Sequence, residues 1–199
     1  MATKWRRSLP CGAALTTVLM LAPVISAQTH ATPERFTALA VNLERGTSGQ
    51  VEIAINRSST EAERDRLIST LMDQGPEKLL DVLRGMPRVG YIRTPESVGY
   101  DIHYARRAPL PDGGEQVVVV TDRRIEFWEA ANRPRSIDYP FTVIELHLNP
   151  DGEGEGKISV ATRITADRQN RIITLENYST QPVLLRSVKR ERAGSSLEP

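Results

Sequence analysis

Most of the chain alternates apolar and polar residues with a period of two, which is typical of β-strands that bury one face. In residues 50–57, for example, Val51, Ile53 and Ile55 share one face of the predicted strand. Turn-forming residues separate such segments at the short spacing of β-hairpins. The pattern predicts about nine short strands, at residues 36–43, 50–57, 89–94, 98–107, 115–122, 139–148, 157–165, 171–176 and 182–190.

Between the second and third predicted strands, the apolar residues recur at helical spacing instead. Thr60 followed by Glu63 is the capping-box pattern that begins a helix. The Gly75–Pro76 pair is typical of one helix ending and the next beginning. Residues 60–85 are therefore expected to form an αα-hairpin, whose apolar stripes need the predicted sheet as a packing partner. The charged run within its first helix is expected to be a solvated face.

Four consecutive valines at 117–120 predict a central strand that is covered on both faces, with the helical hairpin over one of them. Together, these elements indicate a mainly β protein of the α+β class. We expect an antiparallel β sandwich or open barrel of about nine short strands with one αα-hairpin packed on it. One domain is expected at residues 36–192, after a loose segment at 28–35 and before a frayed tail at 193–199.

The first 27 residues have the order of features that a signal peptidase reads. The segment begins with a positively charged region that contains Lys4, Arg6 and Arg7. An apolar stretch follows at 13–25, and small residues lead up to Ala27. This stretch is shorter than the roughly 20 residues that span a bilayer, although a retained N-terminal anchor is the alternative. We expect cleavage near Ala27, a periplasmic or secreted product, and membrane contact only during export.

The 199-residue chain has balanced charge, with 26 Lys and Arg residues against 25 Asp and Glu residues and a formal net charge of +1. This balance argues against nucleic acid as a partner bound through a basic surface. The single cysteine, Cys11, lies within the export segment, which excludes a disulfide framework and thiol catalysis in the remaining chain. Because no phosphate-cradling glycine loop is present either, no cofactor is expected.

Asp101 and His103 are two positions apart on a predicted strand, so their side chains are expected on the same face. A carboxylate can orient an imidazole as a general base, and Glu145 or His147 on a neighbouring strand can join such a site. This set predicts a hydrolase or a metal-assisted enzyme. The alternative is a solvent-facing pair, which the absence of Gly-x-Ser-x-Gly and His-Glu-x-x-His motifs favours.

The glycine-rich stretch at 149–156 places acids at Asp151, Glu153 and Glu155. Three carboxylates at this spacing can supply oxygen ligands to calcium. An EF-hand loop that started at Asp151 would need an acid where Thr162 stands. The favoured interpretation is therefore a plain hairpin turn, with no metal site.

A long connection at 123–138 mixes aromatic residues with arginines. Phe127, Trp128, Arg133 and Arg135 form a candidate binding surface, because arginine beside aromatic residues is common at interface centres. The alternative is that the two aromatic side chains plug one end of the sheet, while the arginines pair with local acids.

Three segments carry a resemblance to known sequences: the stretch from Phe127 to Phe141, Arg88 to Pro95, and Asp151 to Lys157. With them the chain resembles an uncharacterised family of exported bacterial proteins, over about residues 51–190. That family has no assigned activity, so the resemblance implies a bacterial exported protein and no functional residue.

Together these observations predict an exported, non-enzymatic binding or interaction protein for a small ligand or a protein partner. A barrel variant of the fold would enclose a small apolar ligand. The alternative is the enzyme that would use Asp101 and His103.

Overall fold

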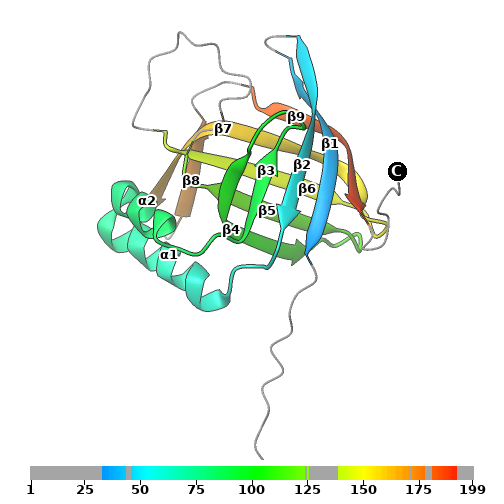
Figure 1. Ribbon diagram of the computed structural model, residues 1–199. Helices are drawn as coiled ribbons and strands as arrows, with labels where there is room; N and C mark the ends of the chain where they lie inside the picture. The colour runs from blue at the N-terminus through cyan, green and yellow to red at the C-terminus, as the bar shows by residue number, and fades with distance from the viewer. Residues whose placement is uncertain are drawn as a thin grey trace, which may run out of the picture.

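A computed structural model describes residues 33–43, 46–123, 125, 139–170, 172–177 and 181–191. Within these residues it contains nine strands and two helices (Figure 1). They are β1 (Glu34–Asn42), β2 (Thr47–Ile55), α1 (Glu61–Gln74), α2 (Pro76–Arg84), β3 (Gly90–Arg93), β4 (Tyr100–Pro109), β5 (Glu115–Thr121), β6 (Phe141–Leu148), β7 (Glu153–Asp167), β8 (Ile172–Asn177) and β9 (Val183–Glu191). Each of the nine expected strands and the αα-hairpin are thereby confirmed, although β1 begins at Glu34, inside the segment expected to be loose.

The strands form one antiparallel sheet in the order β6-β5-β4-β3-β2-β1-β9-β7-β8. A further pairing, between β6 and β7, joins this sheet to itself. Eight strands therefore make a closed barrel, and β8 remains outside it (Figure 1). The first strand of the barrel lies beside the last one, because β1 pairs with β9. The β-rich α+β class is confirmed, and the expected sandwich or open barrel is corrected to a closed barrel.

The glycines of β7 allow the barrel to close. The turn expected at 149–156 ends sooner, because β7 already begins at Glu153 and pairs with β6 on one edge and β9 on the other. A side chain at Gly154 would collide with the carbonyl oxygen of His147, and one at Gly156 with that of Glu145. Only glycine permits this close approach of the two backbones.

The interior of the barrel is filled by its own apolar side chains. All eight barrel strands contribute to one buried cluster, in which Phe36, Ile53 and Leu146 are fully buried. An eight-stranded barrel is just wide enough for such a filling. The space that a barrel variant would offer to an apolar ligand is therefore occupied by these side chains.

The helical hairpin covers part of the outer wall. Val117 and Val119 point into the barrel, whereas Val120 packs against a second cluster that α1 and α2 form with Phe141 and Ile164. The prediction that this strand is covered on both faces is confirmed in part: its inward side chains are buried, whereas its outer face is half-buried and the helical hairpin packs on it at Val120. β7 continues past the end of β6, and its residues Thr162–Asp167 pair with β8. We call this two-stranded extension the β7–β8 ribbon; the helices lie beside it (Figure 1).

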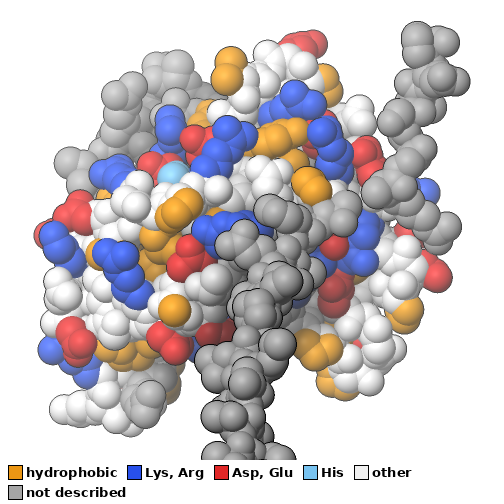
Figure 2. Space-filling model, turned by 60° about the horizontal axis from the view of Figure 1, so that its bottom comes forward, with side chains coloured by type: hydrophobic (Ala, Val, Ile, Leu, Met, Phe, Trp, Pro, Cys, Tyr) orange, Lys and Arg blue, Asp and Glu red, His pale blue; other side chains and the backbone are white. Residues whose placement is uncertain are grey.

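Charged side chains of both signs are interspersed over the face that Figure 2 shows. Apolar side chains lie between them in small groups. This mixture matches the balanced composition of the chain and offers no broad basic surface on that face of the described residues.

The predicted capping box at the start of α1 is confirmed and extended by an ion pair. The Glu63 amide donates to Thr60 Oγ1 (3.1 Å), and the Thr60 amide donates to Glu63 Oε2 (2.8 Å). Arg57 donates two hydrogen bonds to the same carboxylate, at 2.8 and 2.9 Å. These hydrogen bonds, that from Arg57 foremost, lower the pKa of Glu63 to about 2 against the raising effect of its burial. The network ties the end of β2 to α1.

The substitution Glu63→Gln is expected to lower the free energy of unfolding by about 2 kcal/mol at pH 7. Because the pKa of Glu63 is lowered in the folded state from 4.5 to about 2, this stabilisation is present above pH 4.5 and is lost as the pH falls toward 2. Urea titrations at pH 7 and pH 3 should therefore show a smaller difference from wild type at pH 3. Glu77→Gln, at the exposed first turn of α2, is the matched control. A pH-independent difference would contradict the assigned role of the carboxylate.

Candidate functional site

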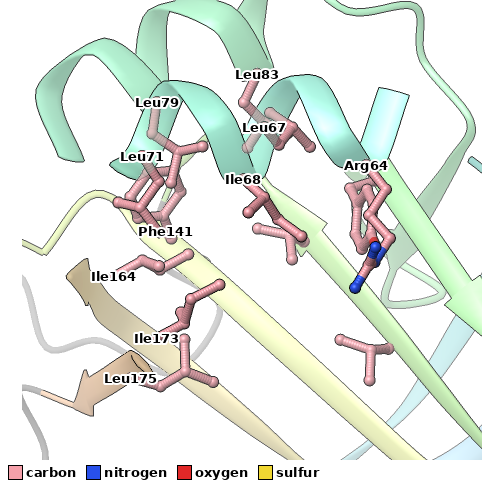
Figure 3. Close-up of a pocket in the computed structure, with 13 residues that line it drawn as sticks. Arg64, Leu67, Ile68, Leu71, Leu79, Leu83, Phe141, Ile164, Ile173 and Leu175 are labelled. Carbon is pink, nitrogen blue, oxygen red and sulfur yellow. The ribbon is translucent and has the colours of Figure 1, made fainter. Parts of the chain in front are cut away.

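A concave apolar surface lies between the helical hairpin, the outer wall of the barrel and the β7–β8 ribbon (Figure 3). Its volume is about 310 Å³. We call it the hairpin groove. Its lining residues are Arg64, Leu67, Ile68, Leu71, Leu79, Leu83, Tyr104, Val118, Val120, Phe141, Ile164, Ile173 and Leu175.

Two periodicities in the sequence build this groove. The helical stripe of α1 turns Ile68 toward the barrel, and the strand alternation of β5 places Val118 on the outer face opposite it. The ribbon supplies the third side. In its register Leu175 lies opposite Ile164, and Ile173 opposite Ala166, so both β8 side chains share the face that packs toward the helices.

The ribbon side of the groove is only partly covered. Ile173 is 43% exposed and Leu175 is 47% exposed, although both line an apolar concavity. Burying exposed apolar surface contributes about 25 cal/mol per Å². An apolar molecule in the groove would thus gain free energy from covering side chains that the fold itself leaves in contact with water.

Arg64 is the only charged residue among the described side chains that line the groove. It lies at the end away from Leu71 and Phe141, and its guanidinium points into the groove (Figure 3). It contacts Asp65 at 3.1 Å and Glu61 at 3.8 Å, and both acids are largely exposed. Within the charged run of α1 that was expected to face solvent, Arg64 also faces the groove.

Asp101 and His103 do not form the candidate catalytic pair, and His103, whose side chain is only 13% exposed, does not face the solvent as the favoured interpretation expected. Asp101 pairs with Arg88 at 3.0 Å. His103 Nδ1 donates to the carbonyl oxygen of Met86 (3.0 Å), while its Nε2 lies 3.8 Å from Asp122 Oδ1. The carboxylate that faces the imidazole is therefore Asp122, which directly follows the valine strand and which sequence spacing alone did not connect to His103.

The other two candidates lie on β6, opposite Gln116 and Val118 of β5, and each has a partner other than His103. His147 lies opposite Gln116 near the start of β5, whereas Asp122 follows the end of β5. His147 contacts Gln116 at 3.3 Å, and Glu145 pairs with Lys157 at 3.1 Å. The barrel thus keeps His147 and Glu145 apart from the imidazole of His103.

The acidic glycine-rich stretch forms a tight turn and the start of β7. Asn149 Oδ1 accepts hydrogen bonds from the amides of Asp151 and Glu153. Glu153 pairs with Lys189 at 3.2 Å, and Glu155 pairs with Arg186 at 2.8 Å. Across the described ranges, no three His, Cys, Asp or Glu residues are grouped in a way that could hold a metal ion.

The candidate binding surface of the long connection lies outside the described residues. This applies to Phe127, Trp128, Arg133 and Arg135. Its described residue Ile125 is fully buried, and its amide donates to Thr142 Oγ1 at 3.1 Å.

Four charged residues that sequence reasoning did not single out meet at one end of the barrel. Glu34 pairs with Arg107, Arg190 pairs with Glu115, and Arg190 Nε lies 3.6 Å from Glu34. The Arg190 guanidinium also lies over the ring of Phe36, 5.5 Å from its centre. These residues come from β1, β4, β5 and β9, so no local pattern groups them. Their two positive and two negative charges balance. Because they lie at the end of the barrel beside the core residue Phe36, they form a charged layer that covers the apolar core there.

The substitution Arg190→Met is expected to lower the free energy of unfolding by about 2 kcal/mol, because two half-buried carboxylates lose a cation. Arg186→Met is the matched control on the same strand. Its pair with Glu155 is exposed and should contribute less than about 1 kcal/mol. Urea denaturation of both variants tests this difference, and equal losses would contradict the role given to the charged layer.

No helix within the described ranges is long and apolar enough to cross a membrane. The chain matches no family model, no curated protein and no solved structure.

Proposed function

We propose that this protein is an exported binding protein that holds the apolar part of a small ligand in the hairpin groove. The observation that carries the proposal is the groove itself. It is concave, its lining is apolar apart from Tyr104 and Arg64 at the described positions, and one side consists of exposed Ile173 and Leu175. Small-molecule sites are typically lined in this way, with volumes of about 300–1,000 Å³.

The filled interior of the barrel favours this outer site. A barrel that holds a ligand needs a cavity in its interior. Here the inward side chains fill the interior as one buried cluster. The enzyme alternative has less support, because Asp101 pairs with Arg88 and not with His103.

Export is supported by the positive, apolar and small-residue order of residues 1–27. The protein recovered from the periplasm or medium of a bacterial host should have the mass of a chain that begins near Gln28. Intact-mass spectrometry checks this expectation. A recovered protein with the mass of the full 199-residue chain would contradict it.

Neutral alkyl ligands test the groove. We expect 1-octanol, 1-decanol and 1-dodecanol to displace the neutral dye N-phenyl-1-naphthylamine from the purified protein. The dissociation constant should fall by up to about fourfold for each added methylene group, because each buried CH₂ contributes about 0.8 kcal/mol. A dissociation constant that does not depend on chain length would contradict binding in an apolar groove.

The variant Val118→Gln places an amide on the groove floor and should weaken dodecanol binding by about tenfold. Val98→Gln makes the same chemical change at a fully exposed loop position and should leave binding unchanged. If Val118→Gln lowers the thermal midpoint strongly, Ile68→Gln on α1 replaces it. Equal binding by wild type and all groove variants would overturn the proposed site.

A further inference from the structure

We infer that the ligand of the hairpin groove is a single-chain carboxylic acid of medium length, whose carboxylate Arg64 binds at the mouth of the groove. This inference rests on the proposed function and names the chemical class of its ligand.

The position of Arg64 divides the groove into a charged end and an apolar end. Arg64, Ile68 and Leu71 follow one another at helical spacing, so they lie along one face of α1. Figure 3 shows Arg64 at one end of this row, with Leu71 and Phe141 at the other. A molecule that fills the groove therefore meets a guanidinium at one end and only apolar groups at the other.

The guanidinium is available to an anion. Its contacts with Asp65 and Glu61 involve acids that are about 70% exposed, and exposed ion pairs contribute little. Glu61 is also shared, because Arg106 lies 3.3 Å from it and interacts with the groove residue Tyr104. Glu61 is thus shared by two arginines, and of the two acids beside Arg64 only Asp65 lies within hydrogen-bond distance of it.

The chemistry of this end favours a carboxylate on a single chain. The planar fork of arginine matches a carboxylate through two parallel hydrogen bonds, and such charge-assisted bonds strengthen where water is partly excluded. The volume of about 310 Å³ is at the lower limit of small-molecule sites. It suits one medium-length chain better than a lipid with two chains.

The test compares three ligands with the same alkyl chain and different head groups: dodecanoate, 1-dodecanol and dodecyltrimethylammonium. Displacement of N-phenyl-1-naphthylamine at pH 8, below the micelle concentration of each ligand, gives the three dissociation constants. Wild type is expected to bind dodecanoate at least about tenfold more tightly than dodecanol, and dodecyltrimethylammonium more weakly than dodecanol.

Arg64→Gln is expected to remove the preference for dodecanoate over dodecanol, because the amide of glutamine carries no positive charge for the carboxylate. Arg66→Gln is the matched control, because Arg66 is an exposed arginine on the same helix that does not line the groove. It should keep the wild-type preference. Arg64→Lys should restore only part of it, since an ammonium lacks the planar fork.

The possible outcomes separate the two proposals. Equal affinity of wild type for dodecanoate and dodecanol, or a preference that persists in Arg64→Gln, overturns the head-group inference and leaves the groove as a site for neutral apolar ligands. Failure of all three ligands to bind overturns the proposed function, and the head-group inference with it.

Discussion

The backbone pairing between β6 and β7 is the constraint on which the rest of the structure depends. It converts a nine-stranded sheet with two edges into a closed barrel, and it requires the two glycines at positions 154 and 156, where any side chain would strike the carbonyl oxygens of β6. Closure turns one face of every barrel strand inward, so the interior becomes a solid apolar core. A ligand site can then be formed only on the outside or at the ends.

The same strand, β7, also builds one side of the hairpin groove. At 15 residues it is longer than its partner β6, and the surplus carries Ile164 beyond the barrel wall to meet the helices. β8 then pairs along this surplus and contributes Ile173 and Leu175. Core and groove are therefore coupled through one continuous backbone. A change that shifts the register of β7 would move the side of the groove together with the seam of the barrel.

Local sequence patterns predicted the helices and strands well, but they did not predict contacts between residues far apart in the chain. The capping box at Thr60, the Gly75–Pro76 junction and the four valines all depend on neighbouring residues, and each is present as expected. Closure of the barrel depends on glycines that, in the sequence, are equally typical of a turn. His103 and Asp122 meet because β4 and β5 are paired, and Arg64 faces the groove because the hairpin docks at one particular place on the wall. The spacing of residues along the chain does not predict these contacts.

The adjacency of β1 and β9 also sets the order in which the barrel can form. Residues 35–41 find one of their two neighbouring strands only when residues 184–191 are available. A chain that crosses a membrane unfolded, with its N-terminus first, would hold one edge of β1 unpaired until translocation is nearly complete. Pairing between such distant segments is slow, because the chain loses the entropy of a long loop before the stabilising contacts between the strands form. During that interval the open edge of β1 is a place where another chain can pair.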